Sequence, residues 1–160
     1  RLEQKSDHFH MEELDFSALV SSVCNDMALL KEHGIQLTSE IEERTKVVGS
    51  REQLSRLLSN LVSNAYRYGR ENGTIRVTLK SEGSNAVLSV SDNGIGIAPE
   101  QQEKIFHRFY QVDASRTGTG TGLGLSMVQE IARLHGGAVS VESTLGRGSC
   151  FTFKMKKTKN

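Results

Sequence analysis

The stretch SREQLSRLLSNLVSNAYRYG, residues 50–69, carries the clearest structural pattern in the chain. Ser50 and Gln53 form a capping box, in which the serine hydroxyl accepts a hydrogen bond from a free N–H of the first helical turn. Apolar residues then recur at helical spacing, namely Leu54, Leu57, Leu58, Leu61 and Ala65. Gly69 is typical of a helix end. The stretch therefore predicts a helix from Gln53 to Tyr68 with one face turned toward a core.

Further helices and strands are predicted on both sides of this helix. One helix should begin at Ser17 as its N-cap and stop at Gly34, and another should run from about Gly124 to His135. Strand patterns cover 35–41, 46–48, 74–79, 86–90, 138–141 and 150–155. Short turns join adjacent strands, without regular alternation of strand and helix. This favours an α/β sandwich of the α+β class, with a mixed, largely antiparallel sheet and helices on one face, over a doubly wound sheet.

Size and charge limit the kind of protein. The chain has 160 residues, 20 Lys and Arg, 19 Asp and Glu, and a net charge of +1. That length predicts a single domain, and the near-neutral charge argues against a general polyanion-binding protein. No apolar run approaches the roughly 18 residues that cross a membrane. Cys24 and Cys150 are far apart, which suits two buried thiols in a reducing, cytosolic compartment.

The predicted helix of residues 53–68 carries polar side chains on one face. Asn60 and Asn64 are four residues apart, and Arg67 follows three residues later. Amide oxygens are hard ligands for Mg²⁺, and arginine pairs with phosphate oxygens, so the face suits a magnesium triphosphate. From this helix alone, the interpretation that carries more weight is that both asparagines are surface residues that the helix tolerates.

Asp92 ends a predicted strand on the same face as Leu88 and Val90. An inward carboxylate can accept a hydrogen bond from the exocyclic amine of adenine, and the flexible backbone of residues 93–96 allows a flat ligand to approach. The alternative is an ordinary turn between two strands. Pro99 and the residues after it read as the start of a helix, which argues against that turn.

Glycines crowd residues 118–124, directly before the predicted helix that begins near Gly124. Free N–H groups and the helix dipole make such a junction suitable for phosphate. The run lacks the Lys-Ser/Thr of a P-loop and the spacing of a dinucleotide or protein-kinase glycine loop. A flexible linker is the alternative.

Taken together, four motifs resemble the N, G1, F and G2 boxes of the catalytic and ATP-binding domain of bacterial sensor histidine kinases, two-component proteins of the GHKL superfamily. They are N60LVSNAYRY68, D92NGIG96, F106HRF109 and G120TGLGL125. The resemblance runs from about Glu12 to Met155 and implies the Bergerat ATP-binding fold. It also implies a domain that binds ATP and Mg²⁺.

The resemblance implies roles for individual residues. Asn64 would hold Mg²⁺ with Asn60 assisting, Arg67 would contact phosphate, and Tyr68 would line the cleft. Asp92 would bind the adenine amine. Further nucleotide contacts would be Gly94, Gly96, Ile97, Phe109, Gly120, Thr121, Gly122, Leu123, Gly124, Leu125 and Ser149.

The stretch from Gly96 to Gly122 would be the ATP lid. Phe106 and Phe109 would anchor this lid, and Arg108 or Arg116 would stabilise charge on the γ-phosphate. Ser149 belongs to a Gly-x-Gly-Ser sequence that also occurs in these domains, and its hydroxyl would support the adenine side.

The same family transfers phosphate to a histidine on a helical dimerisation domain, where an acidic residue usually follows that histidine. None of the five histidines here is followed directly by an acidic residue. We therefore expect residues 1–9 to be a remnant of that domain or a linker, 10–156 to be the catalytic domain, and 157–160 to be a tail. The histidines are expected to be surface or packing residues.

The expected partners are the helical phosphoacceptor domain of the same protein and a response regulator receiver domain, with no nucleic acid. We expect an isolated domain of this kind to be a monomer, cytoplasmic, in a parent protein at the cell membrane.

One further interpretation stays open. A regulatory module could hold ATP without transferring phosphate. Hydrolases and protein-serine kinases with this fold carry a glutamate where Asn60 stands, which ranks both lower because no other carboxylate is placed to activate water or a hydroxyl.

Overall fold

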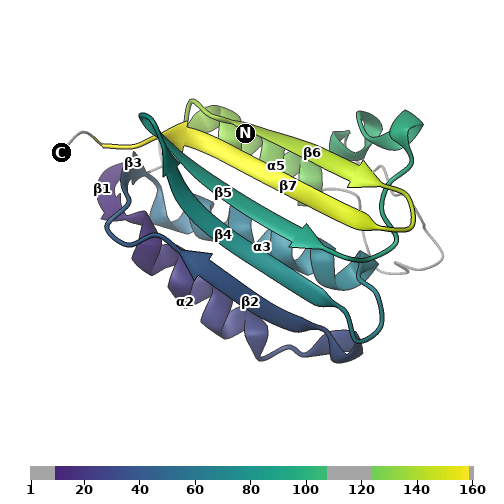
Figure 1. The fold of residues 1–160 in the computed structure, drawn as a ribbon. Helices are drawn as coiled ribbons and strands as arrows, with labels where there is room; N and C mark the ends of the chain where they lie inside the picture. The colour runs from purple at the N-terminus through teal and green to yellow at the C-terminus, as the bar shows by residue number, and fades with distance from the viewer. Residues whose placement is uncertain (1–9, 108–123, 159–160) are drawn as a thin grey trace.

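A five-stranded sheet organises the computed structural model, which describes residues 10–107 and 124–158. The strand order is β2-β4-β5-β7-β6, with β2 parallel to β4 and the remaining pairs antiparallel. The strands are β2 (Gln36–Ile41), β4 (Thr74–Glu82), β5 (Asn85–Asp92), β6 (Ala138–Thr144) and β7 (Gly148–Lys156). Figure 1 shows these strands side by side.

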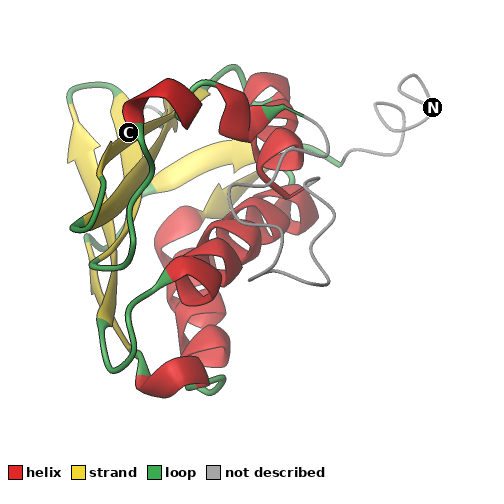
Figure 2. Ribbon diagram, turned by 90° about the vertical axis from the view of Figure 1, so that its right-hand side faces the viewer, coloured by secondary structure: helices red, strands yellow, loops and turns green. Residues whose placement is uncertain are grey.

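Within the part of the chain that the structure describes, three α-helices cover one face of the sheet, so this part has two layers (Figure 2). They are α2 (Phe16–Ala28), α3 (Arg51–Tyr68) and α5 (Gly124–Leu134). The core between the layers contains fully buried side chains from both, including Leu61 of α3 and Phe153 of β7. The expected α/β sandwich with helices on one face is thereby confirmed.

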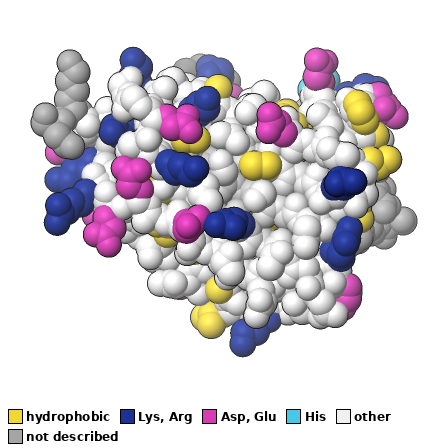
Figure 3. Space-filling model, in the orientation of Figure 1, with side chains coloured by type: hydrophobic (Ala, Val, Ile, Leu, Met, Phe, Trp, Pro, Cys, Tyr) yellow, Lys and Arg dark blue, Asp and Glu magenta, His cyan; other side chains and the backbone are white. Residues whose placement is uncertain are grey.

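The other face of the sheet is polar. Figure 3 shows charged side chains of both signs interspersed across it. The Nη2 atom of Arg76 on β4 lies 2.7 Å from Oε1 of Glu40 on β2, and Lys80 projects from the same face of β4. Alternation of buried and exposed residues along β4 is what a sheet with one solvated face requires.

The start of α2 differs from the prediction. Asp15, not Ser17, is the N-cap, and its carboxylate accepts a hydrogen bond from the N–H of Ala18 at 3.1 Å. Ser17 lies buried in the first turn, where its hydroxyl donates to the carbonyl of Glu42 and accepts from the N–H of Thr45 at 3.0 Å. The prediction was wrong because both residues are good caps, and only the chain at 42–45 decides between them.

The end of α2 also lies earlier than predicted. The helix ends at Ala28, and a short 3₁₀ turn, Glu32–Gly34, follows it. Gly34, the predicted stop, therefore ends this turn rather than the helix.

A two-stranded sheet of β1 (Glu12–Asp15) and β3 (Lys46–Gly49) lies beside the main sheet. The strand β1 has four residues and was not predicted. The expected tail is ordered at its start, since the N–H groups of Lys157 and Thr158 donate to the carbonyls of Ser84 and Lys46. Cys24 is buried as expected, and Cys150 is only half-buried; both are free thiols.

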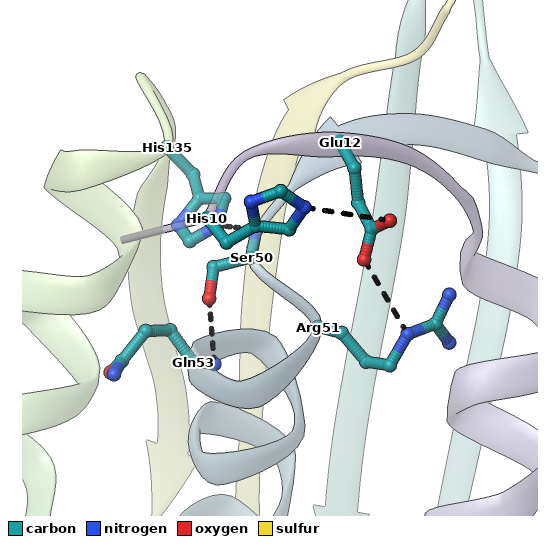
Figure 4. Close-up of polar contacts among 6 residues, drawn as sticks. All are labelled: His10, Glu12, Ser50, Arg51, Gln53 and His135. Atoms are coloured by element: carbon teal, nitrogen blue, oxygen red, sulfur yellow. Dashed lines mark hydrogen bonds and ion pairs between the residues drawn. The ribbon is translucent and has the colours of Figure 1, made fainter. Parts of the chain in front are cut away.

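The capping box at the start of α3 is only half as predicted. The Ser50 hydroxyl accepts from the N–H of Gln53 at 3.2 Å, as expected. The Ser50 N–H, however, donates to Nε2 of His135 at 3.0 Å, where a capping box would use the Gln53 side chain (Figure 4). His135 thus joins the segment after α5 to the start of α3.

The tautomer of His135 follows from its two contacts. Because Nε2 accepts from Ser50, the ring proton is on Nδ1, which donates to the carbonyl of Ile131 at 2.9 Å. Burial lowers the pKa of His135 below its ordinary value of 6.5. The expectation of a packing histidine is confirmed here in a specific form, a buried neutral ring.

Candidate functional site

The asparagine face of α3 borders the core. Asn60, Asn64 and Arg67 are all half-buried, next to the fully buried stripe that includes Leu61 and Ala65. This is the position that the helical spacing predicted for them. The side chains therefore stand where the wall of a cleft would begin.

These side chains differ in the contacts they make. The Nδ2 atom of Asn60 donates to Sδ of Met127 on α5 at 3.6 Å, so α5 packs against the asparagine face. Within residues 10–107 and 124–158, the carboxamide of Asn64 and the guanidinium of Arg67 make no hydrogen bond or ion pair. Both groups remain available for an oxygen-rich ligand.

Asp92 ends β5 and turns inward, as its spacing predicted. Its Oδ1 accepts from the N–H of Gly94 at 2.8 Å. Burial raises the pKa of Asp92 from 3.8 to about 6, and backbone hydrogen bonds from Gly94 and Ser149 hold that rise back. The carboxyl is therefore ionised at neutral pH, yet costly to keep so, which suits a ligand that donates hydrogen bonds.

The chain after Asp92 is fastened to the end of α3. The N–H of Ile95 donates to the carbonyl of Tyr68 at 3.1 Å. A Cβ atom on Gly94 would lie 2.1 Å from that same carbonyl oxygen, so only glycine fits there. Asp92 and Asn64, far apart in the sequence, are in this way held on adjoining elements.

Gly96 has a comparable packing role. Its φ is +74°, and a Cβ atom there would lie 2.2 Å from the carbonyl oxygen of Thr144. The glycines of this motif were expected to let a base approach. The structure adds a second reason for them, since both sit against other parts of the backbone.

Ser149 lies beside Asp92 on β7. The two residues are directly paired in the β5–β7 register, and Ser149 is buried. Its hydroxyl lies 2.9 Å from that of Ser143 on β6, and Ser143 also accepts from the N–H of Ile97 at 2.7 Å. The expected adenine residues Asp92, Ile97 and Ser149 thus belong to one connected group.

The stretch expected to be a lid begins with two 3₁₀ turns, Pro99–Gln101 and Lys104–Phe106. Phe106, the expected anchor, packs edge-on against Phe151, with ring centroids 6.2 Å apart. Several residues of the expected lid and of the glycine run lie outside the described part of the chain. They are Arg108, Phe109, Arg116, Gly120, Thr121, Gly122 and Leu123.

The first residues of α5 are described. Gly124 is exposed, and a Cβ atom there would meet no described residue within 4 Å. Leu125 is half-buried and packs against the core. Since Met127 on this helix contacts Asn60, the start of α5 lies near the asparagine face of α3.

Two polar residues of this region were not predicted. Ser143 and Gln102 connect Ile97 with Ser149, although neither residue belongs to a motif. The period of two along β6 could have indicated Ser143, because Val139 and Val141 place it on the inner face. Gln102 gave no such signal.

Charged groups also gather at the opposite end of α3 (Figure 4). Glu12 lies 3.7 Å from Nε of Arg51 and 4.0 Å from Nε2 of His10. At a rise of about 1.5 Å per residue, this cluster is roughly 20 Å from Asn64. Within the described residues, no group of three or more His, Cys, Asp and Glu side chains could hold a metal ion, and no helix is long and apolar enough to cross a membrane.

Comparisons with known proteins show the family and the fold of the chain. Residues 49–159 match the family model described as histidine kinase-, DNA gyrase B-, and HSP90-like ATPase. The sensor histidine kinase RppB of Synechocystis is 46% identical over 109 residues, which are 67% of this chain and 24% of RppB.

Two solved structures share the fold at higher coverage of this chain. The nucleotide-free catalytic domain of the histidine kinase ThkA has a TM-score of 0.82 at 30% identity, covering 94% of this chain and 97% of that one. Full-length ShkA in complex with AMPPNP has a TM-score of 0.83 at 27% identity, covering 96% of this chain and 32% of ShkA. The chain thus spans about a quarter of RppB and a third of ShkA.

Proposed function

The chain belongs to the histidine kinase-, DNA gyrase B- and HSP90-like ATPase family, and from this premise we propose that it binds Mg²⁺-ATP and transfers the γ-phosphoryl group to a histidine on a separate helical domain. The chain is the catalytic ATP-binding domain of the histidine-kinase type, as its similarity to RppB and ThkA indicates. ATP binding follows from the family. The use of Mg²⁺, the acceptor and the individual contacts are our proposals.

One observation carries the proposal. The hydrogen bond from Ile95 to Tyr68 holds the loop after Asp92 against the end of the helix that carries Asn64. An adenine-binding carboxylate and a phosphate-side amide are thereby fixed relative to each other. Preorganisation of this kind is what phosphoryl transfer demands of a protein, because its catalysis is mostly positioning and charge stabilisation.

At the adenine end, Asp92 accepts a hydrogen bond from the exocyclic amine. Above a pH of about 6 its carboxylate is charged, so that bond is charge-assisted. Ile97 and the backbone of Gly94 and Gly96 line the base, and Ser149 lies beside Asp92.

At the phosphate end, Asn64 and Asn60 supply amide oxygens for Mg²⁺, and Arg67 pairs with a phosphate oxygen. The residues fit this ion, since Asn64 is half-buried and its carboxamide offers a hard oxygen and forms no hydrogen bond within the described residues. When bound, Mg²⁺ neutralises charge on the phosphate oxygens. Tyr68, Gly124 and Leu125 line the cleft, and Arg108, Phe109, Arg116 and residues 120–123 keep the roles that the motif resemblance assigns to them.

In the transfer step, a ring nitrogen of the acceptor histidine forms a bond to the γ-phosphorus while the bond from that phosphorus to the β–γ bridging oxygen breaks. ADP leaves with that oxygen. Asn60 occupies the position at which related hydrolases place a glutamate, so no carboxylate on this helix face activates water, and hydrolysis should be slow.

We further propose that the acceptor lies on a helical dimerisation domain of the same protein, joined through residues 1–9, and that a response regulator receiver domain then takes the phosphoryl group. In this arrangement the domain of residues 10–156 is monomeric and faces the cytoplasm, in a parent protein at the cell membrane.

The test is a mixing experiment. The chain, the helical domain of its parent protein, Mg²⁺ and ATP labelled at the γ-phosphate should give an acid-labile phosphohistidine on the helical domain. The same mixture with Asp92→Asn should give much less, and the chain alone should label barely at all. Binding of ATP without any transfer would contradict the kinase proposal and select the regulatory ATP-binding module.

A further inference from the structure

Three inward side chains form a row across the end of the sheet. Asp92 on β5 pairs with Ser149 on β7, and Ser149 pairs with Ser143 on β6. Figure 1 shows the end of β5, the start of β7 and the end of β6 lying together. Residues paired in this way have Cβ atoms about 4.5–5.5 Å apart and point to the same face. The row therefore runs from the carboxylate to a residue that no motif includes.

The hydroxyl oxygen of Ser143 is the hub of this row. It accepts from the N–H of Ile97 at 2.7 Å, donates to the carbonyl of Gly148 at 2.9 Å and lies 2.9 Å from the hydroxyl of Ser149. A serine hydroxyl has one proton and two lone pairs. The proton of the Ser143 hydroxyl is used by the Gly148 carbonyl, and one lone pair of its oxygen accepts from the Ile97 N–H. Only the second lone pair remains for the hydroxyl of Ser149.

The direction of the bond between the two serines follows. Ser149 must donate its proton to Ser143, because the reverse direction would leave the oxygen of Ser143 pressed at 2.9 Å against the Gly148 carbonyl without a proton between them. The hydroxyl of Ser149 then has lone pairs and no proton to offer a ligand.

Gln102 holds this arrangement in place. Its Nε2 donates one hydrogen to the carbonyl of Ile97 at 2.9 Å and the other to the carbonyl of Ser143 at 3.1 Å. The two segments that meet at the hub are thus clamped together. The N–H of Ile97 is thereby held in a fixed direction, so it continues to occupy one lone pair of the Ser143 hydroxyl oxygen.

We propose that Ser143 is a positioning residue for base selectivity, because it takes the proton of Ser149 and leaves that hydroxyl as a hydrogen-bond acceptor beside Asp92. The inference rests on the proposed function. Two neighbouring acceptors suit an exocyclic amino group, which has two hydrogens to donate. A 6-oxo purine presents an oxygen lone pair at the same place, so neither the Asp92 carboxylate nor the Ser149 hydroxyl, both acceptors, can form a hydrogen bond with it.

The experiment compares equilibrium binding of ATP and ITP, which differ in the amino or oxo group at position 6. Ser143→Ala frees the proton of Ser149, which can then donate to the oxo group. The ratio of the ITP Kd to the ATP Kd should fall about three- to ten-fold, the range expected when one neutral hydrogen bond to the base is gained or lost. Ser143→Thr, which keeps a hydroxyl, should restore the ratio, and Ser140→Ala on the outer face of the same strand is the control.

The binding ratio distinguishes a selectivity role of Ser143 from a purely structural one. If Ser143→Ala weakens the binding of ATP and of ITP equally, the ratio of their Kd values stays that of the unaltered protein. Ser143 would then have only a structural role, and the inference would be overturned while the proposed function would stand. Failure of the unaltered protein to bind ATP would overturn the proposed function as well. If Ser143→Ala does not fold, Ser149→Ala replaces it: loss of the acceptor should also lower the ratio, and an unchanged ratio would overturn the inference.

Discussion

The backbone N–H of Ile95 donates a hydrogen bond of 3.1 Å to the carbonyl oxygen of Tyr68, the last residue of α3. The last carbonyls of a helix have no partner within the helix, so the loop after β5 completes the end of α3. Through this contact the loop after Asp92 and the end of the helix that carries Asn64 are joined directly. The relative placement of Asp92 and Asn64 depends on it.

Replacing Gly94 should break that contact. In Gly94→Ala the new Cβ would lie 2.1 Å from the carbonyl oxygen of Tyr68, and backbone must move to relieve the clash. We expect a loss of about 2–3 kcal/mol in the free energy of unfolding, measured by urea denaturation, together with weaker ATP binding. Gly83→Ala is the matched control, because its Cβ meets nothing within 4 Å and only the backbone conformation costs about 1 kcal/mol. Equal effects of the two variants would contradict this account.

Asp92→Asn should weaken ATP binding. The amide removes the charge from the acceptor, so we expect a loss of roughly 10-fold or more in affinity and less discrimination against guanine nucleotides. Calorimetric titration with ATP and GTP measures both effects. An unchanged ATP affinity would remove Asp92 from the pocket.

The same variant should be more stable than the unaltered protein at neutral pH. Burial raises the pKa of Asp92 from 3.8 to about 6, so the cost of holding its charge is complete above about pH 6, decreases as the pH falls from 6 to 3.8, and disappears below 3.8, where both states are protonated. The gain for Asp92→Asn at pH 7.5 has an upper limit of about 3 kcal/mol and should vanish toward pH 4. Urea unfolding at both pH values tests this, and a gain that does not depend on pH would contradict it.

Asn64→Ala should weaken ATP binding in the presence of Mg²⁺ more than in its absence. The carboxamide oxygen is the proposed ligand, and removing it leaves the adenine contacts intact. Titrations with Mg²⁺ and with EDTA give the two affinities. Ser63→Ala, an exposed neighbour on α3, serves as the control. Equal losses under the two conditions would exclude a metal role for Asn64.

His135 should make the fold sensitive to acid. Its pKa is lowered by burial, so the folded state favours the neutral ring, and the stabilising effect is complete above the ordinary value of 6.5. As pH falls from 6.5 through the lowered value, the unfolded chain takes up a proton and this effect is lost.

The comparison with His135→Asn isolates that loss. The advantage of the unaltered protein over the variant, about 1–2 kcal/mol at pH 7.5, should shrink as the pH falls below 6.5. The titration of Asp92 is common to both proteins and cancels in the difference. A constant difference across pH would contradict the description of His135 as a buried ring with a lowered pKa.

Local signals predicted much of the fold correctly. The stripe of α3, its Ser50 cap and its end at Gly69 are properties of contiguous residues, and the structure has all three. Alternation along β4 and β5 also marked those strands, because a sheet with one solvated face imposes a period of two. The inward turn of Asp92 follows from the same period.

Where two local solutions were equally good, sequence reasoning failed. Asp15 and Ser17 are both suitable caps, and the choice came from Glu42 and Thr45, which bind Ser17 from another segment. Strand β1 is too short to show a period, and it exists because β3 pairs with it.

The sequence by itself determined most of the elements, the family and the identity of the polar groups, since these depend on residue type and spacing within short stretches. Only the tertiary structure decided how those groups are protonated and aimed. Ser149 and His135 have their proton positions set by Ser143, Ser50 and Ile131, which come from other elements. The physical reason is that a hydroxyl or an imidazole can donate or accept, and the partner that folding brings beside it makes the choice.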